Sequence, residues 1–276
     1  MNSRKLKKRI EWFFGLFIPP KVIKANISYL APDQILKGKK VIVTGGSRGI
    51  GYAIAKKFVS EGADVLITGR DEKLLQSVSE ELSCSYLKLD VMKVSDFPQF
   101  MEKADAILQN ANVLVNNAGI SLHEGDIRHV TEESYDSQFD TNLKGAYFLS
   151  QEFLKRQKER GNCCILFVSS ERGKYVDDIP YGLTKAAVNS LVQGLAFSLR
   201  KTGVRVNAIA PGITATQLTG KTEDNLYAPH YATGRYYLAD EMAEVASFLI
   251  SDASNCISGQ ILYCDNCNSV NSYKKR

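Results

Sequence analysis

A tyrosine and a lysine four residues apart carry the clearest chemical signal in the sequence. Tyr181 and Lys185 follow Pro180 in a segment with helical apolar spacing. Side chains four apart share one face of a helix, so the phenol and the ammonium group would lie together. A nearby positive charge favours the phenolate and lowers the phenol pKa from about 10 toward neutrality. The pair therefore predicts acid–base chemistry near physiological pH.

A glycine-rich turn is the second chemical signal. Residues 44–51 read TGGSRGIG, directly after the buried apolar run Lys39–Thr44. Glycines at such a turn let the backbone bend tightly and approach a pyrophosphate closely. The helix expected to start near Arg48 would direct N–H groups and the positive end of its dipole at a phosphate. Because the turn follows the first strand of a βαβ run, it predicts dinucleotide binding.

Both signals need a sheet to position them, and the hydrophobic pattern from Gly38 onward predicts one. Short β-rich runs alternate with longer helical segments, which is typical of a parallel sheet built from βαβ units. The expected strands are Lys39–Thr44, Asp64–Gly69, Cys84–Leu89, Asn112–Asn116, Cys163–Ser169, Val204–Ile209 and Ile261–Cys264, and the expected helices are Arg48–Glu61, Asp71–Leu82, Glu133–Lys158, Pro180–Lys201 and Asp240–Ile250. We therefore expect an α/β, Rossmann-type, doubly wound sheet that binds ligands beyond the carboxyl ends of its strands.

The chain is expected to form one domain, residues 38–268, with an N-terminal arm, residues 1–37, and a basic tail, residues 269–276. The formal net charge is +5, but basic residues gather in residues 1–11 and 274–276, so the body is close to neutral. A nucleic-acid-binding protein would carry a basic stripe on its folded body. We therefore expect no nucleic-acid partner.

The N-terminal arm has two interpretations. A basic run precedes residues 10–18, IEWFFGLFI, and then Pro19 and Pro20. This stretch is far shorter than the roughly 20 residues that span a bilayer, and no signal-peptide cleavage site follows it. Either the arm packs its aromatic side chains on the domain or a neighbouring subunit, or residues 1–20 rest on an anionic membrane surface.

Cysteine usage bears on the compartment and on metal binding. The six cysteines come without any secretory feature, which favours a reducing cytoplasm. Cys264 and Cys267 form a lone CxxC with no second pair or nearby histidine, so we expect no metal site. The protein is expected to be cytoplasmic, and peripheral at the membrane surface if the arm binds there.

Six motifs in one order resemble the short-chain dehydrogenase/reductase family. They are the TGxxxGIG turn, the NNAG of residues 116–119, Asn142 in DTNLKGAY, Ser170, the YxxxK of Tyr181 and Lys185, and Pro211 with Gly212. The likeness spans Gly38 to about Asp265, and the glycine-rich turn and the Tyr181 region are similar to 3-oxoacyl-(acyl-carrier-protein) reductases. It implies an NAD(P)-dependent oxidoreductase that moves a hydride between a nicotinamide and a carbonyl or alcohol.

The resemblance also implies a role for each catalytic residue. Tyr181 would act as the acid in reduction and the base in oxidation, and Lys185 would lower its pKa and bind the nicotinamide ribose. Ser170 would hydrogen-bond the substrate oxygen. Asn142 would order a water that links Lys185 to bulk solvent. Ser169 stays an alternative to Ser170, because Ser170 precedes Tyr181 by fewer residues than is usual in the family, although it fits the family's spacing to a following glycine.

The coenzyme is expected to be NADP(H) rather than NAD(H). NAD-preferring enzymes of this fold usually carry an acidic residue at the end of the second strand. Gly69 holds that place here, Arg70 follows it, and Arg48 lies in the turn, so two guanidinium groups without a carboxylate would suit a 2′-phosphate. The coenzyme-binding set implied by the resemblance is Gly45, Ser47, Arg48, Gly49, Ile50, Gly51, Arg70, Asp90, Val91, Asn117, Ala118, Gly119, Tyr181, Lys185, Pro211, Gly212, Ile213 and Thr216, with Asp90 and Val91 beside the adenine and Ile213 and Thr216 at the carboxamide.

The substrate is expected to be a small carbonyl or alcohol covered by a polar, lid-like segment, residues 217–236. Two substrate classes stay open: a 3-oxoacyl thioester, and a sugar or polyol derivative. His230, within this segment, is expected to be solvated. The rival hypothesis is a nucleotide-binding sensor or scaffold that has lost catalysis. Such proteins usually lose the tyrosine or the lysine, and this sequence keeps both.

Two further expectations concern assembly. The resemblance implies a homodimer or homotetramer formed through the helices at 133–158 and 180–201. The family usually closes with a strand and an Asp-Gly-Gly turn, whereas Asp265 is followed here by Asn266 and Cys267. Loss of both glycines is expected to change the geometry of this turn near the subunit interface.

Overall fold

A single parallel sheet organises the chain. The computed structural model describes residues 22, 24, 34–156 and 163–270. Its strands are β1 (Lys40–Thr44), β2 (Asp64–Gly69), β3 (Ser85–Lys88), β4 (Val113–Asn116), β5 (Cys164–Val168), β6 (Arg205–Pro211) and β7 (Ile261–Cys264). They pair in the order β3-β2-β1-β4-β5-β6-β7, and every pairing is parallel. From β1 the chain adds β2 and β3 on one side of the sheet and then, from β4 onward, adds strands on the other side. This reversal of strand order at β1 and β4 confirms the expected doubly wound fold.

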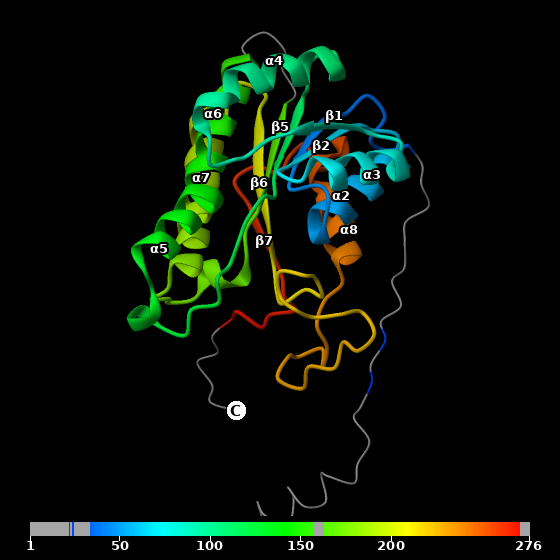
Figure 1. The fold of residues 1–276 in the computed structure, drawn as a ribbon. Coiled ribbons are helices and arrows are strands. Elements are labelled where there is room, and N and C mark those ends of the chain that lie inside the picture. Colours follow the sequence, from blue (N-terminus) through cyan, green and yellow to red (C-terminus); the bar gives the residue numbers. More distant parts are fainter. Residues whose placement is uncertain (1–21, 23, 25–33, 157–162, 271–276) are drawn as a thin grey trace, which may run out of the picture.

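Helices cover both faces of the sheet (Figure 1). They are α2 (Gly49–Ser60), α3 (Glu72–Leu82), α4 (Phe97–Leu108), α5 (Glu132–Phe139), α6 (Ala146–Arg156), α7 (Pro180–Leu199) and α8 (Ala239–Ile250), with short 3-10 turns η1 (Val94–Asp96), η2 (Ile127–His129), η4 (Glu171–Lys174) and η5 (Asp252–Ser254). One core joins alternate strand residues such as Val41 and Val43 to α2, α3 and α8. The other joins residues such as Ile42 to α4, α6 and α7. This alternation follows from the two-residue period of a strand.

The helix expected over Glu133–Lys158 is interrupted. A π-helical turn, η3 (Asp140–Gly145), separates α5 from α6, and residues 157–162 lie outside the described residues. The turn brings Gly145 against the segment that follows β3, where an added Cβ would lie 2.3 Å from the carbonyl oxygen of Val91. A regular helix was therefore the wrong expectation, because the apolar spacing does not reveal this local widening. Such π-turns often occur at functional sites.

The turn after β7 has two consecutive non-glycine residues with positive φ. Asn266 and Cys267 have φ values of +48° and +65°. The Asp265 carboxylate stabilises this conformation by accepting hydrogen bonds from the backbone N–H groups of Cys267 (3.1 Å) and Ser269 (2.9 Å). The aspartate thus holds two non-glycine residues in the left-handed region, and a change of the turn relative to the family stays a prediction.

The arm and the tail lie largely outside the described residues. The expected contacts of the arm with a membrane or with the domain therefore stay predictions. Leu36 is fully buried in the core, two residues before the expected start of the domain, and its N–H bonds to the Glu61 carbonyl oxygen.

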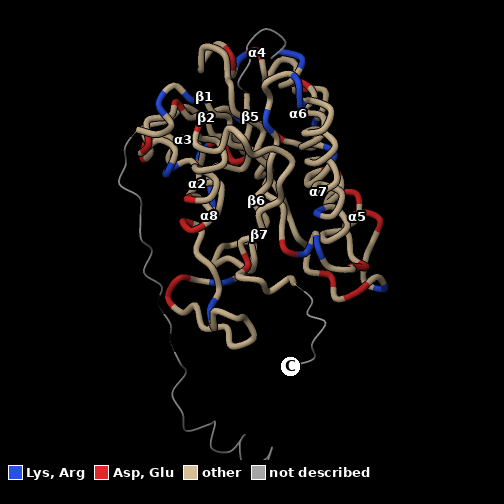
Figure 2. Tube along the Cα trace, turned by 180° about the vertical axis from the view of Figure 1, so that it is seen from behind, with Lys and Arg blue, Asp and Glu red and all other residues tan. Residues whose placement is uncertain are grey.

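Lys/Arg and Asp/Glu residues are interspersed along the described trace (Figure 2). No helix within residues 34–156 and 163–270 is long and apolar enough to cross a bilayer. No group of three or more potential ligands in those ranges could hold a metal ion.

Candidate active site

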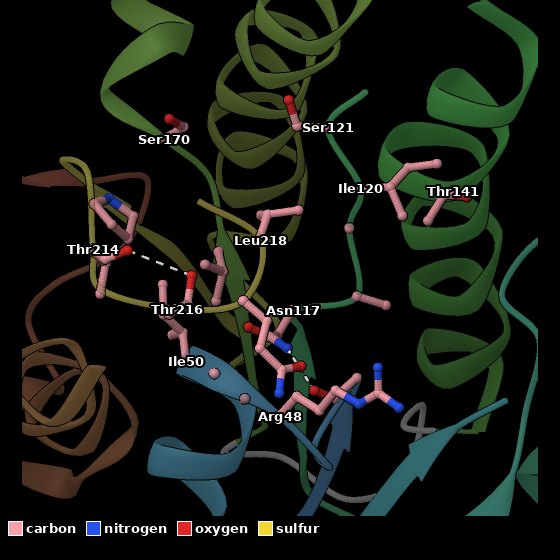
Figure 3. A pocket seen from close by; sticks show the side chains of 18 of the residues that line it. Arg48, Ile50, Asn117, Ile120, Ser121, Thr141, Ser170, Thr214, Thr216 and Leu218 are labelled. Carbon is pink, nitrogen blue, oxygen red and sulfur yellow. Dashed lines mark hydrogen bonds between the residues drawn. The ribbon is translucent and has the colours of Figure 1, made fainter. Parts of the chain in front are cut away.

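A cavity of about 710 Å³ follows the carboxyl ends of the central strands. Of the residues expected to bind the coenzyme or to act in catalysis, all of which the structure describes, only Asn142 does not line it. Figure 3 shows Arg48 and Ile50 at one end of the cavity and Ser121 and Ser170 at the other. The sheet therefore brings together motifs that lie far apart in the sequence, as the rule for ligand sites in open α/β sheets predicts.

The glycine-rich turn between β1 and α2 is shaped to accept a phosphate. Gly45 and Gly49 have positive φ values, and a Cβ on Gly51 would lie 2.2 Å from the Gly45 carbonyl oxygen. Arg48 caps α2 without a side-chain hydrogen bond among the described groups, so that no capping side chain competes for the N–H groups of the first helical turn. Such N–H groups are a ready anion site. The turn thus fits the pyrophosphate of a dinucleotide.

The NNAG segment after β4 braces this turn. The Thr44 hydroxyl accepts hydrogen bonds from the backbone N–H groups of Asn117 (2.9 Å) and Ala118 (3.0 Å). The Asn117 amide donates to the carbonyl oxygens of Thr44 (2.8 Å) and Gly45 (3.1 Å). The Asn117 side chain therefore acts on the turn itself and fixes the floor of the cavity.

The end of the cavity that Arg48 and Arg70 line contains an unexpected carboxylate. Arg48 and Arg70 line this end together with Asp71. The Arg48 guanidinium lies 3.5 Å from the Asp71 carboxylate, which also caps α3 by accepting from the N–H of Leu74. The expectation of two arginines with no carboxylate was wrong in this respect, because the α3 cap follows Arg70 directly.

Tyr181 and Lys185 share the inner face of α7, as expected from their spacing. The Lys185 Nζ lies 5.6 Å from the centre of the Tyr181 ring and donates to the Val168 carbonyl oxygen at 2.9 Å. Lys185 is 5% exposed, and burial lowers its pKa to about 8. An ammonium group held among backbone carbonyls at the end of β5 is well placed to bind hydroxyl groups of a ligand in the cavity.

The phenol of Tyr181 differs from expectation in its acidity. Burial raises its pKa above the usual value, whereas a hydrogen bond with Ser170 and the positive charge of Arg172 oppose that rise. The expected lowering of the phenol pKa by Lys185 is contradicted for the protein alone. The reason is that burial disfavours the phenolate more strongly than Ser170 and Arg172 favour it.

The structure places Ser170 beside the phenol and turns Ser169 away. The Ser169 hydroxyl donates to the Asn189 side-chain oxygen on α7 at 2.6 Å. The Ser170 hydroxyl accepts from the Arg172 N–H at 3.2 Å, and Ser170 lines the cavity with Tyr181 and lowers the pKa of its phenol. The short loop between Ser170 and Tyr181 is closed by Arg172, whose Nε donates to the Asp177 carboxylate at 2.6 Å.

Gly182, at the start of α7, makes this short loop possible. An added Cβ there would overlap the Asp177 carboxylate at 1.9 Å. The loop therefore packs directly on the helix backbone, and Ser170 and Tyr181 meet although few residues separate them.

Asn142 occupies a supporting position behind the cavity. Its side-chain oxygen accepts from the Ile120 N–H at 2.8 Å, and its amide donates to the Ile120 carbonyl oxygen at 2.9 Å and to the Thr184 hydroxyl at 3.2 Å. An added Cβ on Gly119 would lie 3.3 Å from that side-chain oxygen and 3.6 Å from the Lys185 Nζ. The side chain of Asn142 thus joins η3, the segment after β4 and α7.

The segment between β6 and α8, residues 212–238, forms one wall of the cavity and is called the lid below. Ile213, Thr214 and Thr216 line the wall, and the Thr214 hydroxyl donates to the Gly212 carbonyl oxygen at 2.9 Å. His230 is exposed, as expected. Other residues line the cavity without having been assigned to the site, among them Ser121, His123 and Glu171. Nothing in their spacing marks them, because they reach the cavity only through the fold.

The chain is similar to known proteins along nearly all of its described length. A family model described as enoyl-(acyl carrier protein) reductase matches residues 45–266. A 3-oxoacyl-[acyl-carrier-protein] reductase from Chlamydia pneumoniae is 34% identical over 84% of this chain and 98% of that protein. A 3alpha-hydroxysteroid dehydrogenase from Mediterraneibacter gnavus is 34% identical over 84% of this chain and 97% of that protein.

Solved structures give the same picture. A 3-ketoacyl-(acyl-carrier-protein) reductase from Brucella melitensis complexed with NADH superposes with a TM-score of 0.81 at 30% identity, covering 85% of this chain and 100% of that one. A short-chain dehydrogenase from Burkholderia cenocepacia in complex with NADP superposes with a TM-score of 0.75 at 30% identity, covering 84% of this chain and 98% of that one.

Proposed function

Because this chain belongs to the short-chain dehydrogenase/reductase family of NAD(P)-dependent oxidoreductases, we propose that it interconverts a carbonyl and an alcohol with NADP(H) and that Tyr181 exchanges the proton. One observation carries this proposal. Tyr181, Ser170 and Lys185 line the same cavity as the phosphate-binding turn, and the Lys185 Nζ lies 5.6 Å from the centre of the Tyr181 ring. A coenzyme held at the turn by its pyrophosphate would extend along the cavity toward these three side chains.

Some of these residues would hold the substrate or the coenzyme, and others would transfer the proton. The bound nicotinamide would supply or accept the hydride. Ser170 would hold the substrate oxygen beside the phenol, and Tyr181 would give its proton to that oxygen during reduction. Lys185 would bind the coenzyme ribose. Because its pKa is about 8, it can also resupply a proton to the phenolate near neutral pH.

The proposed coenzyme is NADP(H). Arg48 and Arg70, at the end of the cavity away from Ser170, can form charge-assisted hydrogen bonds with a 2′-phosphate. Similar structures contain NADP in one case and NADH in another, so the preference rests on these two arginines.

The proposed substrate is a 3-oxoacyl thioester, with a sugar or polyol derivative as the second candidate. Leu218, at the cavity wall, is 41% exposed. An exposed apolar side chain at the wall favours an acyl chain over a polyhydroxylated molecule. The 3-oxoacyl reductases among the similar proteins point the same way.

The test is the Tyr181→Phe variant, assayed by NADPH oxidation against a panel of diketones, 3-oxoacyl thioesters and keto-sugars. General acid catalysis contributes about 10²–10⁴-fold, so kcat/KM should fall at least about 100-fold while NADPH binding, followed by fluorescence, is retained. Tyr147→Phe, at an exposed position of α6, is the matched control. Equal activity of Tyr181→Phe and wild type would refute the role of Tyr181. A wild-type protein that binds NADPH yet reduces nothing would favour the sensor or scaffold hypothesis.

A further inference from the structure

Glu171 is a buried carboxyl group that the proposed reaction does not use. It directly follows Ser170, lines the cavity and is 5% exposed. Burial raises its pKa. The adjacent cation, Arg172, is bonded to Asp177 instead. A buried carboxyl group is costly unless it is well hydrogen-bonded, so its contacts indicate what it is for.

Those contacts come from two distant segments. The Tyr231 hydroxyl, in the lid, donates to the Glu171 Oε1 at 3.0 Å. The Asn268 amide, in the segment after β7, donates to the Glu171 Oε2 at 3.0 Å. The Tyr175 hydroxyl donates to the Asn268 carbonyl oxygen at 3.2 Å and closes the group. In Figure 1 the yellow and orange lid and the red segment after β7 lie at the same end of the sheet.

The rest of the lid is fixed near its root. Thr214 pairs with Tyr237 in a short β-bridge, and Arg235 forms an ion pair with Glu241 on α8 at 2.6 Å. The bridge joins the two ends of the lid to each other, and the ion pair joins the second end to α8. The bond from Tyr231 to Glu171 is different, because it joins the outer part of the lid to the residue next to Ser170.

We propose that Glu171 is a positioning residue whose carboxyl group latches the lid, through Tyr231, and the segment after β7, through Asn268, onto the loop that carries Ser170. The latch closes the substrate end of the cavity around the reacting carbonyl. Its kinetic consequence rests on the proposed function, whereas the latch itself can be measured without any substrate.

Limited trypsin digestion measures the latch directly. Lys221 is an exposed lid residue, and Lys201 is an exposed residue after α7 that serves as an internal reference. In Glu171→Ala and Tyr231→Phe, cleavage after Lys221 should be several-fold faster, with cleavage after Lys201 unchanged. Tyr236→Phe is the matched control, because this lid ring packs edge-on against Tyr231 without supplying the latch hydroxyl. It should be cleaved like wild type.

The conservative variant separates hydrogen bonding from charge. In Glu171→Gln the amide oxygen still accepts from Tyr231, and the amide can pair with Asn268 after that side chain turns over. Its cleavage after Lys221 should therefore be close to that of wild type. In turnover, Tyr231→Phe should raise KM for the carbonyl substrate about tenfold with a smaller effect on kcat, as expected for a lost hydrogen bond to a charged group.

Two outcomes would overturn the proposal. One is wild-type cleavage after Lys221 in both Glu171→Ala and Tyr231→Phe. The other is equal acceleration after Lys221 and Lys201, which would mean general destabilisation instead of lid release. Tyr181→Phe could be as active as wild type while cleavage after Lys221 still responds as expected to the latch variants. That result would refute the proposed function and leave the latch supported.

Discussion

Lys185 brings an ammonium group into a place where its charge is disfavoured. A fall in its pKa from 10.5 to about 8 corresponds to roughly 3 kcal/mol of lost stability. This cost is fully present below pH 8, where the lysine is protonated both folded and unfolded. It is relieved as pH rises from 8 to 10.5, because the folded protein then binds fewer protons than the unfolded chain. Lys185→Met should therefore be more stable than wild type at pH 7, and its advantage should shrink toward pH 10.5.

Urea denaturation of both proteins without coenzyme at pH 7 and pH 10 checks this prediction. Lys144→Met removes a half-exposed lysine paired with Asp140 and serves as the control. A stability difference between Lys185→Met and wild type that is the same at both pH values would show that the lysine is not strained by burial. Such a result would also remove the reason for assigning it a proton-transfer role near neutral pH.

Arg70 carries the proposed preference for NADP(H). Arg70→Glu would place a carboxylate at the cavity end expected to hold a 2′-phosphate. Hydrogen bonds to charged groups contribute about 1.5–3 kcal/mol, so KM for NADPH should rise at least about tenfold while KM for NADH changes little. Steady-state kinetics with the two coenzymes at a fixed carbonyl concentration gives the answer. Equal effects on both coenzymes would mean that Arg70 only solvates the start of α3.

Asp71 provides the opposite change at the same place. Asp71→Asn keeps the side-chain oxygen that caps α3 but removes the charge that lies 3.5 Å from the Arg48 guanidinium. Without the Asp71 charge, the Arg48 guanidinium should attract a 2′-phosphate more strongly. KM for NADPH should therefore fall relative to KM for NADH. An unchanged ratio of the two KM values would indicate that Asp71 does not interact electrostatically with the 2′-substituent. Thermal melts would check that the cap of α3 is intact.

At the level of an element, the turn after β7 holds non-glycine residues in a conformation that favours glycine. Cys267 is exposed and has a φ of +65°, a region that costs a non-glycine residue about 1–2 kcal/mol. Cys267→Gly should remove that strain, partly offset by the flexibility of glycine in the unfolded chain. We expect a gain near 1 kcal/mol, or about 2 °C in Tm for a domain of this size. Differential scanning calorimetry measures it.

Cys256→Gly is the control for that substitution. Cys256 is also an exposed cysteine, but it is not among the described residues with positive φ. Glycine there relieves no strain and should leave Tm unchanged or slightly lower. If both variants behave alike, the strain assigned to Cys267 is absent and the Asp265 hydrogen bonds alone set the turn.

The strands and the glycine-rich turn could be predicted from the sequence because their signals are local. A buried strand such as β5 is a short apolar run, and glycines after β1 mark the bend. The π-turn at Asp140–Gly145 could not be predicted, because the helical apolar spacing continues across it. The helix at Phe97–Leu108 was not predicted either, although its apolar residues have helical spacing and a proline stands in its first turn.

The candidate site divides in the same way. Tyr181 and Lys185 were predictable because one helical turn sets their separation. The latch at Glu171 was not, because Tyr231 and Asn268 reach it only after the lid and the segment behind β7 fold back. The choice between Ser169 and Ser170 likewise depended on the direction of each side chain, which the closure of the loop by Arg172 and Asp177 decides.

At the scale of the whole molecule, α7 serves the site with one face and offers the other to a partner. Its inner face holds Lys185, while its outer face carries Leu183 (42% exposed) and Phe197 (69% exposed). Of the four exposed positions between them, three are small, Ala186, Ser190 and Gly194, and the fourth is Gln193. Small residues flanked by apolar ones allow a second helix to approach closely. We therefore propose a homodimer in which α7 packs against α7 of a second copy.

Gly194→Arg tests that assembly with little risk to the fold. An added Cβ on Gly194 meets nothing within 4 Å, and replacing a mid-helix glycine favours the helix by up to about 1 kcal/mol. Two-fold symmetry would bring the two new guanidinium groups close together in a buried interface, where unpaired charge is strongly unfavourable. Light scattering should then report a monomer at concentrations where wild type is a dimer or larger. Ser77→Arg, at an exposed position of α3, should leave the mass unchanged, and an unchanged mass for Gly194→Arg would place the interface on another face.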